Sequence, residues 1–151
     1  MATIIQTLEH TLRSIDPLLA NETKRIHLKE TLQSFVLDYI YNHPKYRMLN
    51  FYGGTCLHVI YGLNRLSEDI DLDNSMGVEL DSFTEDLLDH FHKVLGYQDM
   101  SLKHQESQQG ISRATLRFPV LYELGLSPHR NEMLHLKVEI SQHQQIAVIK
   151  Q

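Results

Sequence analysis

The stretch that decides the fold runs from Phe51 to Asp73, with the sequence FYGGTCLHVIYGLNRLSEDIDLD. Residues 47–52, which overlap the start of this stretch, are short, apolar-rich and ended by two glycines, which predicts a buried strand entering a tight turn. A helix over about residues 55–61 follows, and Gly62 breaks it. Residues 68–73 then alternate acidic and apolar side chains, which is the pattern of a strand with one face in the core.

The second strand of this stretch carries the first candidate site. Side chains two apart on a strand point the same way, so Asp69 and Asp71 share the face opposite Ile70 and Leu72. Neighbouring carboxylates repel each other unless a cation or water lies between them, and Mg²⁺ prefers one or two carboxylates plus phosphate oxygens. The pair therefore suits a divalent metal, although such a triplet on its own more often forms a solvated strand face.

The turn Gly53-Gly54-Thr55 has the features of a phosphate site. Its backbone amides are not shielded by side chains, it offers a hydroxyl, and it precedes the positive end of a predicted helix. The chain contains neither a Gly-x-x-x-x-Gly-Lys-Ser/Thr loop nor a Gly-x-Gly-x-x-Gly motif. A Walker-type phosphate loop and a dinucleotide-binding fold are thus not indicated.

A further acid lies on a later strand, predicted over residues 134–141. Glu139 is flanked by two β-branched residues, so its side chain faces away from the core, together with that of Lys137. Three carboxylates can hold two metal ions, which activate an attacking hydroxyl and hold a triphosphate for in-line displacement. The alternative is a surface ion pair between Lys137 and Glu139.

Helical spacing of apolar residues accounts for much of the remaining chain. Two amphipathic helices occupy residues 3–43, with Asn21 or Thr23 as the expected N-cap of the second helix. The sequence SFTE at residues 82–85 predicts a capping box for a third helix, which is expected to end at Gly96.

A hairpin is predicted from residues 102–106 and 111–120, which flank a polar, glycine-containing turn. Arg113 and Arg117 alternate on one face of this hairpin. A solvated strand face is the simpler interpretation of these two arginines, and the lining of a nucleotide cleft is the alternative. The apolar residues 146–149 are expected to pair with the last predicted strand.

Length and composition indicate one domain over residues 1–151, with the helices of residues 3–43 preceding a catalytic core at 47–151. The formal net charge of −5 argues against a surface-wide basic field. A single cysteine, Cys56, excludes an internal disulfide, and the sequence predicts neither a signal peptide nor a membrane span. We therefore predict a cytoplasmic protein.

The segments FYGGT at 51–55 and RLSEDIDL at 65–72 together resemble the signature of the AbiEii/AbiGii toxin group of nucleotidyltransferases, in the DNA polymerase beta superfamily. KVEI at 137–140 is similar to the later acidic strand of that group. The resemblance implies a nucleotidyltransferase fold of the α/β (α+β) class. In such a fold a small mixed sheet holds the acidic strands, helices pack mainly on one face, and the metal site lies on the other.

Residue by residue, the resemblance implies that Asp69, Asp71 and Glu139 are the catalytic metal ligands, with Glu139 activating the acceptor hydroxyl. The implied nucleotide-binding residues are Gly53, Gly54, Thr55, Arg65, Ser67 and Lys137. Within that set, Lys137 would offset charge on the nucleotide. The arginine and the serine would steady the metal-binding strand or touch the phosphates.

The implied activity is transfer of a nucleoside monophosphate from an NTP to a hydroxyl on RNA, protein or a small molecule, with Mg²⁺ or Mn²⁺ as cofactor. Expected partners are the NTP, an acceptor such as tRNA or a protein, and a cognate antitoxin, with no membrane. Members of the group usually continue into a helical region, so a chain truncated at its C-terminus or a short variant is also expected. The alternative is a non-catalytic module that keeps the fold and binds nucleotide or a partner.

Overall fold

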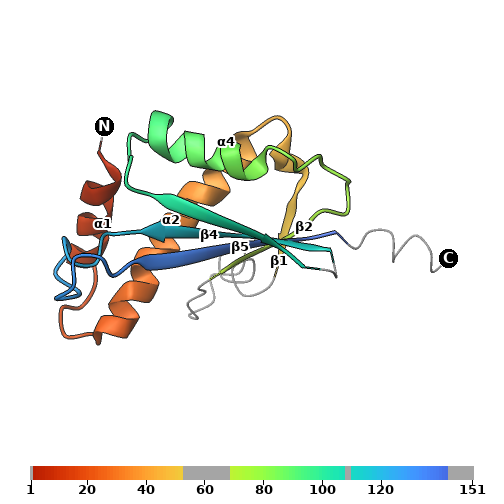
Figure 1. The fold of residues 1–151 in the computed structure, drawn as a ribbon. Coiled ribbons are helices and arrows are strands. Elements are labelled where there is room, and N and C mark those ends of the chain that lie inside the picture. The colour runs from red at the N-terminus through yellow and green to blue at the C-terminus, as the bar shows by residue number, and fades with distance from the viewer. Residues whose placement is uncertain (1, 53–68, 108–109, 143–151) are drawn as a thin grey trace.

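The computed structural model describes residues 2–52, 69–107 and 110–142, and Figure 1 shows their arrangement. The chain begins with two helices, continues into alternating strands and helices, and ends the described part on a strand. The elements in order are α1 (Ile4–Arg13), α2 (Asn21–Asn42), a 3₁₀ helix (Tyr46–Met48), β1 (Asn50–Tyr52), β2 (Ile70–Asp73), α4 (Phe83–Asp89), a π-helical turn (His90–Val94), β3 (Ser101–Glu106), β4 (Ile111–Phe118) and β5 (Leu134–Ser141).

The five strands form one mixed sheet in the order β1-β2-β5-β4-β3. β2 and β5 run parallel, and every other neighbouring pair is antiparallel. The two strands that carry the predicted acids are therefore direct neighbours near the middle of the sheet. This mixed α+β architecture confirms the predicted fold class.

One face of the sheet forms the core. Alternate residues of the three central strands are almost fully buried on that face, as the period of two requires. They are Ile70, Leu72, Ala114, Leu116, Phe118, Leu134, Leu136, Val138 and Ile140. Helices α1, α2 and α4 supply the facing apolar side chains, among them Leu8, Leu32, Val36 and Leu87. The helices thus pack mainly on one face, which leaves the opposite face for polar side chains.

The helix ends differ from the prediction. Helix α2 begins at Asn21 with Ala20 as N-cap and no side-chain cap, so neither Asn21 nor Thr23 caps it. Ser82 is the N-cap of α4, but its side chain makes no cap hydrogen bond, and the predicted capping box is wrong. A capping box does form at the start of α1, where it joins Thr3 and Gln6.

Local geometry also departs from regular helix and strand in two places. Helix α4 changes into a π-helical turn before it ends, and Gly96 follows with a φ of +70°, which agrees with the predicted stop. The strand predicted over residues 47–52 is shorter than expected, since Tyr46–Met48 is a 3₁₀ turn and β1 begins at Asn50. Tyr46 is fully buried there, against Phe83.

The predicted hairpin and last acidic strand are confirmed as β3, β4 and β5. The helix predicted over about residues 55–61 and the apolar stretch 146–149 lie outside the described residues. Within the described ranges, no helix has both the length and the apolar composition needed to cross a membrane.

Candidate functional site

Two of the three predicted metal-binding acids are side by side. Asp71 on β2 and Glu139 on β5 are register partners in the parallel ladder, so their side chains leave the same face of adjacent strands. That face is opposite the core, because the neighbours Ile70 and Val138 are buried on the other side. The sheet therefore brings together two carboxylates that are 68 residues apart in the sequence.

The pKa of Asp71 reflects its burial and its acidic neighbours. Burial raises the pKa of this carboxyl above its usual value, and the negative charges of Glu139 and then Asp69 raise it further. Asp69 comes directly before β2 and is partly buried. Ionised Asp71 thus sits in an excess of negative charge, an environment that a cation would relieve.

Arg113 on β4 supplies a positive charge next to this acidic pair. It is the register partner of Glu139 on the other side of β5. Its Nε donates to Glu139 Oε2 at 2.5 Å, and its Nη2 lies 2.5 Å from the same oxygen. Glu139 therefore has an acid on one neighbouring strand and a base on the other.

The open face becomes basic towards the beginning of β5. Lys137 and His135 precede Glu139 at two-residue steps and so lie on its face. Burial lowers the pKa of His135, and the positive charges of Arg117, Lys29 and Lys137 lower it further. Lys137 thus belongs to a cationic region that begins next to Glu139.

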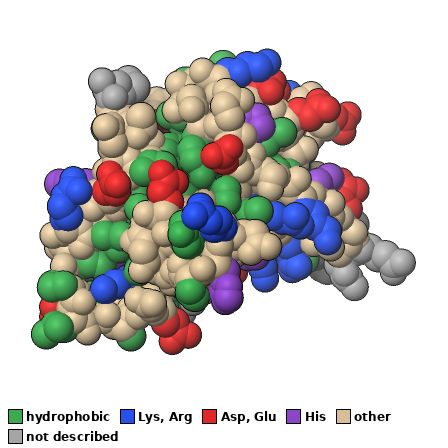
Figure 2. Space-filling view, turned by 60° about the vertical axis from the view of Figure 1, so that its left-hand side comes forward, with side chains coloured by type: hydrophobic (Ala, Val, Ile, Leu, Met, Phe, Trp, Pro, Cys, Tyr) green, Lys and Arg blue, Asp and Glu red, His purple; other side chains and the backbone are tan. Residues whose placement is uncertain are grey.

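Figure 2 shows acidic and basic side chains interspersed on one side of the molecule. The formal net charge of −5 is consequently not spread as a uniform acidic surface over that side. Local groups of like charge, such as the acids on β2 and β5, decide which ligands are attracted.

Asn74 fixes the ends of the two acidic strands and was not anticipated from the sequence. This side chain is fully buried. Its Oδ1 accepts from the Val78 backbone N–H at 2.7 Å, and its Nδ2 donates to the Val78 carbonyl and to Gln142 Oε1. Its own backbone N–H donates to the carbonyl of Ser141 at 2.8 Å. Asn74 therefore ties the end of β2 to the end of β5, which helps to hold Asp71 beside Glu139.

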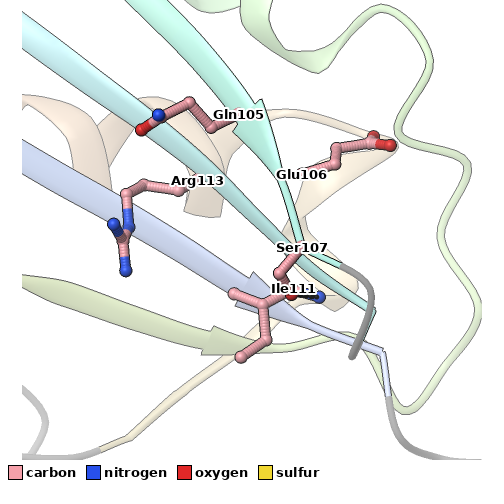
Figure 3. Close-up of a pocket in the computed structure, with 5 residues that line it drawn as sticks. All are labelled: Gln105, Glu106, Ser107, Ile111 and Arg113. Atoms are coloured by element: carbon pink, nitrogen blue, oxygen red, sulfur yellow. Dashed lines mark hydrogen bonds between the residues drawn. The ribbon is translucent and has the colours of Figure 1, made fainter.

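A cavity of about 350 Å³ lies at the turn end of the β3–β4 hairpin. Its lining residues, drawn in Figure 3, are Gln105, Glu106, Ser107, Ile111 and Arg113. Gln105 is the register partner of Arg113, so both side chains lie on the open face of the sheet. In Figure 3 the side chain of Glu106 points away from that of Arg113. Arg113 thus belongs both to the ion pair and to the cavity wall.

The chemistry of the donor set fits Mg²⁺ or Mn²⁺. Asp69, Asp71 and Glu139 offer only carboxylate oxygens, the ligand type that hard divalent cations prefer. In residues 2–52, 69–107 and 110–142, no three Asp, Glu, His or Cys side chains are arranged so that they could hold a metal ion. Glu139 is engaged by Arg113 instead. The metal-ligand roles of the three acids stay predictions.

Several predicted nucleotide-binding residues cannot be placed. Gly53, Gly54, Thr55, Arg65 and Ser67 lie outside the described residues. Their predicted roles in phosphate binding and in support of the acidic strand stay predictions, as does that of Lys137.

A comparison with protein-family models shows which family the chain belongs to. The model described as nucleotidyl transferase AbiEii toxin, type IV TA system, matches residues 36–147. The match covers more than half of the chain and includes both acidic strands. The chain belongs to the AbiEii nucleotidyl transferase toxin family. No curated protein and no solved structure matches the chain significantly.

Membership of the AbiEii family confirms the resemblance seen in residues 51–72 and 137–140. It assigns the chain to nucleotidyl transferases and to toxins of type IV toxin-antitoxin systems as general classes. The match begins within α2, at residue 36. The division into helices 3–43 and a catalytic core 47–151 stays a prediction.

Proposed function

We propose that this AbiEii-family chain is a divalent-metal-dependent nucleotidyltransferase that moves a nucleoside monophosphate from an NTP to an acceptor hydroxyl. The observation that carries the proposal is the register of Asp71 with Glu139 on adjacent parallel strands. Burial raises the pKa of Asp71, and the negative charges of Glu139 and Asp69 raise it further, so a cation beside these acids would favour their ionised forms.

Asp69, Asp71 and Glu139 would hold the metal ions, which supply charge neutralisation for the triphosphate and lower the pKa of a bound hydroxyl. Asp71 and Asp69 belong to the β2 side of the site, and Glu139 belongs to the β5 side. This arrangement suits a reaction with a nucleotide on one side and an acceptor on the other. Glu139 is the acid that we assign to the acceptor hydroxyl.

In the proposed reaction the acceptor oxygen forms a bond to the α-phosphorus of the NTP. The bond between the α-phosphorus and the bridging oxygen to the β-phosphate breaks, and pyrophosphate leaves. The Glu139 carboxylate would accept the hydroxyl proton. Lys137, next to Glu139 on the open face, would attract the phosphates, and the predicted Gly53-Gly54-Thr55 turn would bind them through backbone amides.

The test is transfer of label from each α-³²P-labelled NTP to total RNA or to protein, with Mg²⁺ and with Mn²⁺. The full chain should label at least one acceptor class, and Asp71→Asn should abolish the labelling. Asp99→Asn makes the same chemical change at an exposed loop position and should leave labelling intact. Equal labelling by the Asp71→Asn variant would exclude the proposed site.

A stability measurement separates catalysis from binding alone. A rise in thermal midpoint with Mn²⁺ plus NTP, but no labelling of any acceptor, would favour a module that keeps the fold and binds nucleotide. Loss of this thermal shift in Asp71→Asn would still place the ligand at the acidic strands.

The family also supports a proposal for the cellular role. We infer that expression of the chain without a cognate antitoxin inhibits bacterial growth through this nucleotidyl transfer. Expression of Asp71→Asn to the same level should allow normal growth. Growth arrest by that variant would show that toxicity does not depend on the proposed chemistry.

A further inference from the structure

Arg113 forms an ion pair with Glu139, the acid that the proposed function assigns to the metal and to the acceptor hydroxyl. Both its Nε and its Nη2 approach one oxygen of Glu139, Oε2, at 2.5 Å. Charge-assisted hydrogen bonds of this kind are about twice as strong as neutral ones. A divalent cation that needs this oxygen must therefore compete with the guanidinium.

The ion pair is exposed enough to exchange. The side chain of Arg113 is 43% exposed and that of Glu139 is 26% exposed. Water screens such a pair, so its net contribution to stability is modest, on the order of that of a surface ion pair. A doubly charged metal would bind the same carboxylate more strongly than one guanidinium does. The contact is thus suited to be replaced when metal arrives.

The surroundings of Arg113 offer the displaced guanidinium another polar environment. On the open face, four neighbouring strands contribute Asp71, Glu139, Arg113 and Gln105 in one register row. The cavity of about 350 Å³ begins on the side of this row away from Asp71, with Gln105 and Ser107 in its wall. Arg113 can leave Glu139 without losing contact with water or with polar side chains.

We propose that Arg113 is a positioning residue that competes with the divalent metal for Glu139 and so weakens metal binding in the absence of nucleotide. This inference rests on the proposed function, because it takes Glu139 as a metal ligand. Its consequence is a site that binds metal poorly until the phosphates of an NTP add further oxygen ligands. Arg113 then controls when the metal site is assembled, and it does not act on the reacting atoms.

The experiment measures Mn²⁺ binding to the full chain by calorimetry or by electron paramagnetic resonance, without nucleotide. Removing one positive charge several ångströms from a dication through solvent-like surroundings should tighten binding roughly tenfold. Arg113→Gln should therefore bind Mn²⁺ roughly tenfold more tightly than the unmodified chain. Arg113→Lys keeps the charge but loses the two-nitrogen contact, so its affinity should fall between the two.

Arg117→Gln is the matched control. Arg117 lies on the same face of β4, four residues further along and so roughly 13 Å from Arg113. Its register partner is His135 and not an acid. The Arg117→Gln variant should keep the Mn²⁺ affinity of the unmodified chain. An equal gain in that control would show a general charge effect and overturn the proposal.

Thermal stability provides a second readout that does not depend on activity. Without metal, Arg113→Gln should melt at a lower temperature, because Glu139 loses its counter-charge beside Asp71. Saturating Mn²⁺ should restore the loss. Unchanged or weaker Mn²⁺ binding by Arg113→Gln, with clear binding by the unmodified chain, overturns the role of Arg113 and leaves the proposed function standing. Failure of every variant to bind Mn²⁺, with or without NTP, overturns both.

Discussion

Replacement of Asp71 by asparagine should make the protein more stable at neutral pH, although it should abolish nucleotidyl transfer. Asp71 is partly buried, and Glu139 on the neighbouring strand and Asp69, directly before β2, repel its charge. Two unit charges about 5 Å apart interact by roughly 1 kcal/mol in water-like surroundings and by more inside the protein. Arg113 offsets part of this repulsion through its contact with Glu139.

We therefore expect Asp71→Asn to raise the free energy of unfolding by about 1 kcal/mol, and the thermal midpoint by about 2–4 °C for a chain of this size. The assay is thermal unfolding at pH 7 in low salt without divalent metal. The same substitution at exposed Asp99 should change the midpoint by much less. Added Mg²⁺ together with an NTP should stabilise the unmodified chain and not the Asp71→Asn variant.

The pH dependence gives the sign of the effect. The pKa of Asp71 is raised in the folded state, so folding favours its protonated form. The cost of its charge is complete above the folded-state pKa. It disappears as the pH falls through that pKa towards the unfolded value of about 3.9. The stability gap between Asp71→Asn and the unmodified chain should therefore narrow from pH 7 to about pH 4. A less stable variant, or a gap independent of pH, would refute this account of the acidic pair.

Two further predictions concern the scaffold that holds the site. Asn74→Ala should lower the free energy of unfolding by about 2–3 kcal/mol, because it removes a buried amide and leaves its backbone partners unsatisfied; chemical denaturation should show this loss, and exposed Asn131→Ala should not. Tyr46→Phe should cost about 1–2 kcal/mol in the same assay, since the buried hydroxyl donates to Asp86 at 2.7 Å. An effect no larger than that of partly exposed Tyr122→Phe would contradict the second prediction.

The local pattern of the acidic strands was sufficient to predict much of the site. Alternation of acidic and apolar residues places Asp71 and Glu139 on the face opposite the core, and burial of Ile70 and Val138 confirms this. Such a pattern depends only on the two-residue period of a strand. The resemblance to the AbiEii group then linked the two strands in one site, which the period alone could not do.

The role of Arg113 was underestimated because its partner is distant in the sequence. A solvated strand face was the simpler interpretation, and only the register of β4 with β5 places the guanidinium on Glu139. Register depends on the packing of whole strands. Asn74 was missed for the same reason, since its hydrogen bonds depend on how the ends of β2 and β5 meet.

The predicted helix caps were wrong for a different physical reason. A cap requires one exact residue at the helix start, and a shift by a single position removes its hydrogen bond. Helix α2 begins one residue earlier than an Asn21 cap requires. At α4, Ser82 has the predicted position, but its backbone has a φ of −103° and a ψ of 5°, outside the extended conformation typical of a cap.

The most direct test of the central claim is the position of Mn²⁺ in crystals of the full chain grown with an NTP analogue that resists cleavage between the α- and β-phosphates. Anomalous scattering should place Mn²⁺ within about 2.0–2.3 Å of carboxylate oxygens of Asp71 and Glu139. It should also show Arg113 withdrawn from Glu139. Mn²⁺ bound elsewhere, with Glu139 still paired to Arg113 beside a bound nucleotide, would contradict the assignment of this acidic pair as the catalytic metal site.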